Sequence, residues 1–341
     1  MLVLPTPKTA PLTGGPTLRW GIIAPGWIAT QLATTVRANT DQEIVAVASS
    51  SAERAADFAA RFEIPKHFDS YSALVEDPEV EAVYVASLNH QHFDHAMLAI
   101  EAGKHVLIEK PVGVSADEAR RIHDAATRAG VLAMEAMWTR FLPQTDVLLQ
   151  LRDEGVFGDL GVVHADFCEM FHPERNARVF SPTVGGGALL DIGIYPLSFA
   201  QFLLGDAEAF TVTGTLTDGG VDATTVIAQS YASGARSVSV TSLELAPAQG
   251  AEVIGSKARA KFTEPFFVAG GFDLLIGDEC HEWRDPNGIV GHGGLCYQVT
   301  AFAEHVADGL LDSPFRPFAD TITILETIDE ARRLIGAIAP R

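Results

Sequence analysis

The sequence predicts two folded domains: an α/β domain with a doubly wound parallel sheet, and an α+β domain with a large, mainly antiparallel open sheet. Three observations predict this. The chain has 341 residues, which is enough for about two domains. As far as residue 137, short apolar runs alternate with stretches of helical periodicity. After residue 138, segments of alternating polarity follow one another with few helices between them.

The first half follows a strand-helix-strand order at the spacing of right-handed parallel crossovers. Its predicted strands are residues 18–24, 43–49, 81–88, 105–110 and 131–137. Its predicted helices are residues 28–39, 52–62, 93–103 and 115–130. Five or six strands in this order make one Rossmann-type domain.

The second half begins with a predicted helix around residues 143–154. The alternating segments expected in its sheet are residues 161–171, 208–217, 224–233, 235–245, 251–262 and 271–277. Further helices are predicted at residues 187–204, 296–311 and 321–335. The expected division is a flexible tail (1–16), a dinucleotide-binding domain (17–138), a substrate and oligomerisation domain (139–320) and a C-terminal helical segment (321–341) that packs back on the body.

Charge and composition exclude several functions. The chain has 24 Lys and Arg residues against 44 Asp and Glu residues, a net charge of -20. Phosphate backbones and anionic lipids repel such a surface, so neither nucleic acid nor a membrane is an expected partner. The three cysteines are far apart, which argues against a disulfide framework and a thiolate metal site. Without an apolar leader, the prediction is a cytoplasmic protein.

The turn after the first strand is typical of dinucleotide binding, where a pyrophosphate rests on helix N-terminal amides. Ala24 occupies the first glycine position of GxGxxG/A, and Gly26 and Ala29 keep the other two small positions. The second strand ends in Ser49 and Ser50 rather than in the carboxylate that NAD enzymes usually carry. Serine hydroxyls and the nearby Arg54 favour a 2'-phosphate, hence NADP, although NAD remains possible. The serines also suit the cap of the next helix.

The third long strand ends near Ser87 and Asn89, with His92 shortly after, at the edge that faces a cofactor in such domains. Asn89 and His92 are therefore expected to shape the cofactor pocket. An alternative is a metal-dependent hydrolase, because the His90/His92 spacing at the end of a strand suits zinc. That alternative requires further ligands at later strand ends, where Glu109 and Lys110 stand instead.

Lys110 follows an apolar strand and precedes a proline, so the backbone leaves the sheet there and presents the lysine at its edge. Such a lysine either pairs with an acid such as Glu109 or takes part in chemistry. Three glycines then precede Asp191 and Tyr195, which share one face if this stretch is helical.

Oxidation of an alcohol by a nicotinamide needs a base for the hydroxyl proton. A tyrosine, with an ordinary pKa of about 10, needs an adjacent ammonium to act near neutrality. Tyr195 with Lys110 meets this requirement, and so does the reverse assignment, in which Lys110 moves the proton and Tyr195 orients the substrate. Asp191 then binds a substrate hydroxyl or positions the lysine. A buried structural tyrosine remains an alternative.

The ordered segments LRWGIIAPGWIA, SLNHQH, GKHVLIEKPVG, MEAMWTRFLP and GGALLDIGIYPLSF resemble the Gfo/Idh/MocA oxidoreductase family. The branch that holds dihydrodiol and NADP-dependent D-xylose dehydrogenases is the most similar. The resemblance implies that Lys110 and Tyr195 are the catalytic pair, and that Trp138 and Arg140 lie with Asp191 near the substrate. It also implies a C-terminal sheet that forms a homodimer or homotetramer. Ser50 stands where NADP enzymes of this branch tend to carry arginine.

The predicted function is therefore an NAD(P)-dependent oxidoreductase acting on a CH–OH group of a sugar, polyol or cyclic trans-diol. The alternative is a non-catalytic nucleotide- or sugar-binding regulator of the same fold. The predicted cofactor-binding residues are Ala24, Pro25, Gly26, Trp27, Ile28, Ser49, Ser50, Arg54, Ser87, Asn89, His92, Glu109 and Lys110. No metal ligand is predicted in the oxidoreductase.

Overall fold

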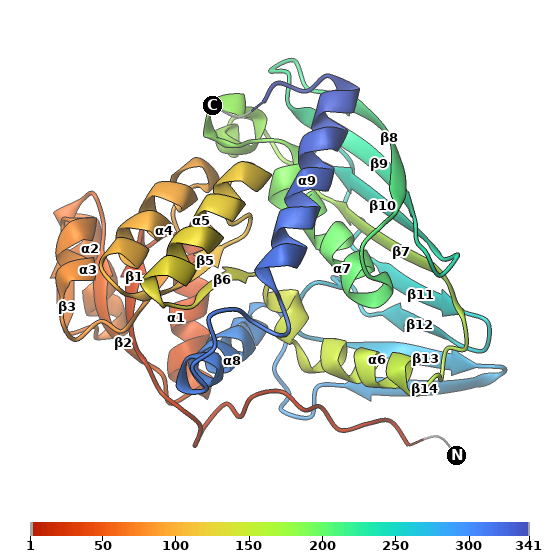
Figure 1. Ribbon diagram of the computed structural model, residues 1–341, viewed down its shortest axis with the longest axis horizontal. Coiled ribbons are helices and arrows are strands. Elements are labelled where there is room, and N and C mark those ends of the chain that lie inside the picture. The colour runs from red at the N-terminus through yellow and green to blue at the C-terminus, as the bar shows by residue number, and fades with distance from the viewer. Residues whose placement is uncertain (1–2, 340–341) are drawn as a thin grey trace. The chain divides into compact units, whose positions relative to one another are not determined.

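The computed structural model describes residues 3–339, which form two compact units (Figure 1). The Rossmann unit consists of Thr9–Phe141 and His292–Ile322. The sheet unit consists of Leu142–Gly291 with the described parts of Met1–Lys8 and Thr323–Arg341.

The Rossmann unit is built on a six-stranded parallel sheet with the order β3-β2-β1-β4-β5-β6. This is the doubly wound order of dinucleotide-binding domains and confirms the predicted fold class. Its strands are β1 (Arg19–Ile23), β2 (Glu43–Ala48), β3 (Lys66–Phe68), β4 (Ala82–Val85), β5 (His105–Glu109) and β6 (Ala133–Ala136). Strand β3 was not predicted from the sequence, because its three partly exposed residues show too little periodicity.

Helices cover both faces of this sheet. They are α1 (Trp27–Asn39), α2 (Ala52–Phe62), α3 (Tyr71–Glu76), α4 (His92–Glu101), α5 (Ala116–Ala129) and α8 (Leu295–Ala307). Short helical turns lie at Asn89–Gln91, Trp138–Phe141 and His292–Gly294. Local capping fixes the boundaries of α5, since the Ser115 side chain accepts from the Glu118 N–H and the helix ends at Gly130 with φ 70°. The late helix α8 packs on α1, and the rings of Trp20 and Phe302 lie 5.1 Å apart.

The sheet unit contains an eight-stranded sheet with the order β14-β13-β12-β11-β7-β10-β9-β8. Only β7 and β10 pair in parallel, and the other neighbours are antiparallel, as predicted. Its strands are β7 (Leu160–Cys168), β8 (Ala209–Leu216), β9 (Asp222–Ser230), β10 (Arg236–Ser242), β11 (Ala251–Gly255), β12 (Arg259–Phe262), β13 (Gly271–Ile276) and β14 (Glu279–Arg284).

Two details of this sheet differ from the sequence analysis. Residues 251–262, predicted as one segment, form two antiparallel strands, because the chain turns at Ser256 and Lys257. The edge strand β14 was not predicted, since it is largely polar and only Trp283 is buried in it. Polarity of this kind is common on edge strands, which must not pair with other chains.

Helices cover one face of the second sheet. They are α6 (Pro143–Asp153), α7 (Ile194–Leu204) and α9 (Phe318–Ile335), with short helical turns at Ala177–Phe180, Pro182–Val184 and Leu189–Gly193. The helix α7 packs on β7 and β10. The predicted final helix begins at Phe318 rather than at residue 321, and its part from Thr323 onward belongs to the sheet unit.

Within the described residues, only Pro182–Leu204 is long and apolar enough to span a membrane, judged by length and composition. Its most apolar window is 94% buried inside the protein. This burial is the property of a core helix, and α7 accordingly packs directly on strands β7 and β10 of the sheet.

The segment predicted to be a loose tail carries no helix or strand between residues 3 and 16. Hydrogen bonds nevertheless hold it. The Lys8 N–H donates to Asp146 Oδ2 at 2.7 Å, and the Gly14 N–H donates to Asp41 Oδ2 at 2.7 Å. The predicted tail and C-terminal segment also include residues 1–2 and 340–341, which lie outside the described part.

The four-part division by residue number stays a prediction. The compact units of the structure differ from this division in one respect: residues 292–320 belong to the Rossmann unit rather than to the sheet unit. Sequence alone gives no signal for this return of the chain, since α8 resembles any amphipathic helix.

Candidate active site

The predicted cofactor-binding residues of the Rossmann unit lie where neighbouring parallel strands end. Strand β1 pairs with β2 and β4, and β4 pairs with β5, all in parallel. The carboxyl ends of these strands therefore share one edge of the sheet. This is the edge where ligands of such sheets bind.

The turn after β1 has an unusual backbone. Ala24 adopts φ 64°, in the left-handed region that favours glycine. Its N–H donates to the Ala48 carbonyl at 3.0 Å, and the Gly26 N–H donates to the Ala24 carbonyl at 2.8 Å. Ala24 thus adopts a backbone conformation that glycine usually supplies at the first position of such a turn.

The N-terminus of α1 is open for an anion. No side chain of the described residues caps it, and its first turn holds no acidic residue. Gly26 is exposed, Pro25 and Ile28 are half-buried, and the Trp27 side chain is 63% exposed. Uncapped amides at a helix N-terminus fit the pyrophosphate of a dinucleotide.

Two of the serines after β2 have distinct partners. Ser50 Oγ accepts a hydrogen bond from Arg54 Nη2 at 3.1 Å, and both residues are exposed. Ser51 Oγ accepts from the Arg54 N–H and caps α2. Both roles considered for this serine run are therefore present: a helix cap, and a hydroxyl beside a guanidinium.

The His92 ring is buried and lies between two backbone carbonyls. Its Nδ1 is 2.6 Å from the Pro111 oxygen, and its Nε2 is 3.0 Å from the Ser87 oxygen. Burial lowers the pKa of His92 to about 4, so the ring is neutral near pH 7 and donates only one of these bonds. We assign that proton to the shorter Nδ1 contact.

These contacts bear on two expectations. Any contribution of His92 to cofactor binding runs through the two loops that it joins. Because both of its nitrogens face carbonyls, the His90/His92 pair is not arranged as metal ligands. Asn89 is buried, and the Ser87 hydroxyl lies 2.9 Å from His95 Nδ1.

Glu109 and Lys110 end strand β5, and a cis peptide joins Lys110 to Pro111. Glu109 is buried and accepts hydrogen bonds from the Tyr84 hydroxyl and, at 3.2 Å, from the Lys110 N–H. Burial raises the pKa of Glu109 to about 6, although the Tyr84 hydrogen bond and the Lys110 charge oppose the shift. Lys110 itself is half-buried at the sheet edge, as predicted.

A buried ion pair that the sequence did not reveal supports the loop after Lys110. Glu135 and Arg316 are both fully buried, with Arg316 Nε 3.0 Å from Glu135 Oε2. Glu135 Oε1 accepts from the Val112 N–H at 3.1 Å, and its Oε2 also accepts from the Thr321 hydroxyl. Glu135 thus ties the loop after Lys110 to a segment that comes some 180 residues later. No local pattern could have identified this partner.

Trp138 and Arg140, predicted near the substrate, are buried in the Rossmann unit. The Trp138 ring stacks on His292 with centroids 5.4 Å apart, and Trp27 meets the same imidazole edge-on at 4.9 Å. His292 therefore links the cofactor turn to Trp138, a role with no sequence signal. Arg140 pairs with Asp320 at 3.3 Å, while burial and the Arg316 charge lower the pKa of Arg140 to about 9.

Asp191 and Tyr195 lie in the sheet unit, on the helix predicted to carry them. Asp191 is in a π-helical turn, Leu189–Gly193, that leads directly into α7. Such turns are frequent at functional sites. Arg178 holds the buried Asp191 carboxylate with two nitrogens, at 2.7 and 3.4 Å. The Tyr195 ring lies 5.5 Å from Phe167 and 5.0 Å from Phe267.

The glycine run before Asp191 permits close approach of another part of the backbone. A Cβ on Gly186 would meet three carbonyl oxygens of residues 178–181 within 2.7 Å. Gly187 has φ 119°, and a Cβ there would meet Asp222 Oδ1 at 2.2 Å. The glycines therefore bring the segment that carries Arg178 beside the start of this helix.

Comparison with known proteins finds a matching family model in each of the two units. A model of an oxidoreductase family with an NAD-binding Rossmann fold matches residues 18–137, and a GFO/IDH/MocA C-terminal domain model matches residues 147–261. Trans-1,2-dihydrobenzene-1,2-diol dehydrogenase of Mus musculus is 33% identical over 95% of this chain and 98% of its own length. The enzyme of the same name from Homo sapiens is 32% identical over the same shares.

Solved structures give the same result. A 3-ketoreductase from Actinomadura kijaniata, in complex with NADP and TDP-benzene, superimposes with a TM-score of 0.80 at 28% identity. The match covers 95% of this chain and 99% of that one. A levoglucosan dehydrogenase shares the fold, with a TM-score of 0.83 at 20% identity over 95% and 99% of the two chains.

Proposed function

Because this chain belongs to the Gfo/Idh/MocA family of NAD(P)-dependent oxidoreductases, we propose that it uses NADP and acts on a sugar, a polyol or a cyclic trans-diol. The reaction moves hydride between the nicotinamide and a CH–OH carbon. The curated relatives are named for a cyclic diol, and the 3-ketoreductase is in complex with NADP and TDP-benzene.

One observation carries the cofactor assignment. Three segments follow neighbouring parallel strands at one sheet edge: the uncapped N-terminus of α1, the serine run after β2 and the loop that begins at Lys110 after β5. The α1 amides would hold the pyrophosphate, and the loops at residues 87–92 and 109–112 would border the nicotinamide end. When bound, the nicotinamide accepts or donates the hydride.

The preference for NADP rests on the second strand. Ser50 and Arg54 present a hydroxyl and a guanidinium where an NAD enzyme would carry a carboxylate. A guanidinium with a neighbouring hydroxyl suits a 2'-phosphate. The NADP in the 3-ketoreductase complex supports the same choice.

We assign the proton-transfer chemistry to Lys110 and Tyr195. In the oxidation direction, a base at the substrate must accept the hydroxyl proton while hydride leaves the same carbon. Tyr195 as base with an ammonium nearby, or Lys110 as base with Tyr195 orienting the substrate, both satisfy this requirement. Asp191, fixed by Arg178, would line the substrate pocket, and Trp138 and Arg140 would lie near it.

The test of this assignment is Tyr195→Phe, which removes one hydroxyl and keeps the ring packing against Phe167 and Phe267. We expect kcat with NADP to fall by about 10²-fold or more, because general acid–base catalysis contributes roughly that much. The Kd of NADPH, measured by cofactor fluorescence, should change less than about twofold. The substrates to screen first are aldoses, inositols and cyclic diols.

Tyr297→Phe is the matched control. Tyr297 is another buried tyrosine, and it is not among the predicted site residues. Turnover should remain at the level of the unmodified enzyme in this variant. Unchanged turnover in Tyr195→Phe would contradict the catalytic role of the tyrosine and leave the family assignment intact.

We further propose that the chain forms a homodimer or homotetramer through the open face of its second sheet. On β10, Ser237, Ser239 and Thr241 are buried on the helix-covered side, whereas Val238 and Val240 point to the open side. Val162, Val226 and Ile254 are 36–38% exposed on that side. An apolar centre on an otherwise polar sheet face favours a second copy of the chain as its cover.

The remaining assignments follow from charge. At a net charge of -20, neither nucleic acid nor an anionic membrane surface is a proposed partner. A cytoplasmic location, where NADP is available, remains part of the proposal.

A further inference from the structure

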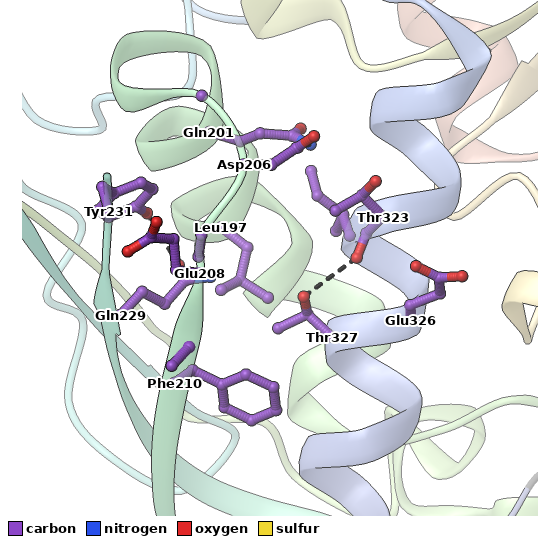
Figure 2. Close-up of a pocket in the computed structure, with 14 residues that line it drawn as sticks. Leu197, Gln201, Asp206, Glu208, Phe210, Gln229, Tyr231, Thr323, Glu326 and Thr327 are labelled. Atoms are coloured by element: carbon purple, nitrogen blue, oxygen red, sulfur yellow. Dashed lines mark hydrogen bonds between the residues drawn. The ribbon is translucent and has the colours of Figure 1, made fainter. Parts of the chain in front are cut away.

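A small cavity lies in the sheet unit, and none of the residues that line it is a predicted site residue. It measures about 260 Å³ and is bounded by the C-terminal end of α7, by β8 and β9, and by α9 (Figure 2). All residues that line it belong to the sheet unit. Drug-sized ligands occupy roughly 300–1,000 Å³, so this cavity suits a smaller molecule.

The floor of the cavity contains a polar group that lacks an acceptor. Gln229 and Tyr231 are 8% and 3% exposed. Gln229 Oε1 accepts hydrogen bonds from the Tyr231 and Ser237 hydroxyls, both at 3.2 Å. In the described part of the chain, nothing accepts from the Gln229 amide NH₂. This NH₂ group is not enclosed by protein atoms, so an oxygen atom of a ligand in the cavity would accept a hydrogen bond from it.

The rim of the cavity is acidic. Asp206, Glu208 and Glu326 carry carboxylates around it, and none of the lining residues is Lys, Arg or His. Gln201, itself 8% exposed, donates from Nε2 to Asp206 Oδ1 at 2.8 Å and holds that carboxylate in place. Such a rim repels phosphates and carboxylates and attracts ammonium groups, which donate charge-assisted hydrogen bonds to carboxylates.

We propose that this cavity binds a small hydroxylated amine in its protonated form, such as an amino sugar. The ammonium group donates to the rim carboxylates, and a ligand hydroxyl oxygen accepts from Gln229. Phe210 supplies an apolar wall for the carbon skeleton. The site needs neither NADP nor the catalytic pair, so it is independent of the proposed reaction.

Calorimetric titration of the full chain with three probes tests the proposal. Glucosamine should bind, glucose should bind at least about tenfold more weakly because it lacks the ammonium, and glucose 6-phosphate should give no binding heat. The affinity for glucosamine should fall with added sodium chloride, since the rim is exposed to screening ions. Equal affinity for glucose and glucosamine would overturn the assignment of a cationic ligand.

Two variants locate the site. Asp206→Asn combined with Glu326→Gln should weaken glucosamine binding by about tenfold or more, and both positions are exposed enough for the fold to tolerate the change. Glu330→Gln, on the same helix and outside the cavity, removes one equal charge and should leave binding unchanged. If glucosamine gives no heat, or binds equally well to the double variant, this cavity is not the site. Turnover with NADP, measured on the same samples, reports separately on the proposed function.

Discussion

At the residue scale, the proposed preference for NADP depends on Ser50. Ser50→Asp would place a carboxylate beside the 2' position, where it repels a phosphate and accepts from ribose hydroxyls. We expect the Kd of NADPH to rise by about tenfold or more and that of NADH to fall, measured by cofactor fluorescence. The unmodified chain should bind NADPH more tightly than NADH.

Ser70→Asp provides the control for this substitution. Ser70 caps α3 in the same unit through the Ala73 N–H, and an aspartate keeps that cap while adding the same charge. Cofactor affinities should be unaltered in this variant. Equal affinities of the unmodified chain for NADPH and NADH would defeat the argument from Ser50 and Arg54.

Glu109 makes stability depend on pH. Its pKa is raised from an ordinary 4.5 to about 6, so the folded state keeps its proton over a range where the unfolded state loses it. Stability from this group is therefore present below about pH 4.5 and is lost as pH rises to about 6. The difference is about 2 kcal/mol, from roughly 1.4 kcal/mol for each pH unit.

Glu109→Gln should remove this dependence. The stability of the variant relative to the unmodified chain should rise by about 2 kcal/mol between pH 4.5 and pH 6, measured by urea unfolding. His92 acts in the opposite direction, since its lowered pKa makes stability fall as pH drops from about 6.5 to about 4. A difference between the two chains that stays constant over this range would contradict the buried, protonated Glu109.

At the scale of elements, the Glu135–Arg316 pair joins strand β6 to the segment before α9. Removal of one partner, by Glu135→Gln or Arg316→Met, should destabilise the protein by about 3–5 kcal/mol. The reason is that the remaining charged partner stays buried without an opposite charge beside it. The double variant should lose much less than the sum of the two. Urea unfolding measures all three.

An exposed pair provides the reference for this prediction. Arg333 and Glu330 on α9 also form an ion pair, but both are largely exposed. Arg333→Met should change stability by about 0.5 kcal/mol or less. The prediction would be contradicted if the Glu135/Arg316 double variant lost as much stability as the two single variants together. That result would show that the two buried groups contribute to stability independently.

Elements in which apolar residues recur with a clear helical or strand periodicity were predictable from the sequence. The βαβ order, the glycine-poor turn at Ala24 and the helix with Asp191 and Tyr195 all follow from local patterns, and the family and fold class are confirmed. Elements without a period were not predicted, as with β3 and β14. The turn between β11 and β12 was also not predicted, so residues 251–262 were expected to form one strand instead of a hairpin.

Partners from distant parts of the chain could not be predicted. Arg178 beside Asp191, Arg316 beside Glu135 and His292 between Trp27 and Trp138 are brought together only by the folded backbone. A single sequence contains the motif residues but gives no distances. The backbone at Ala24 was also not predictable from the sequence. The sequence shows only that an alanine occupies the first glycine position of the motif, whereas the structure shows that this alanine adopts a left-handed φ.

At the scale of the whole molecule, the open face of the second sheet is the proposed assembly surface. Val226→Asp would place a charge at the apolar centre of that face, where Val226 is 38% exposed. We expect the oligomer to dissociate, with the mass from light scattering falling to that of one chain of 36.4 kDa. Val290→Asp, at a residue 72% exposed outside the strands, should leave the mass unchanged. A mass of one chain before any substitution would contradict the interface.

The single parallel pair in the second sheet, between β7 and β10, has a consequence for how the chain divides its surfaces. Parallel neighbours cannot be joined by a tight turn, so the chain between them must leave the sheet and return across one face. That crossover contains the helix with Asp191 and Tyr195, which packs on the same two strands. One hydrogen-bonding choice between two strands therefore keeps the proposed catalytic helix and the proposed assembly surface on opposite sides of a single sheet.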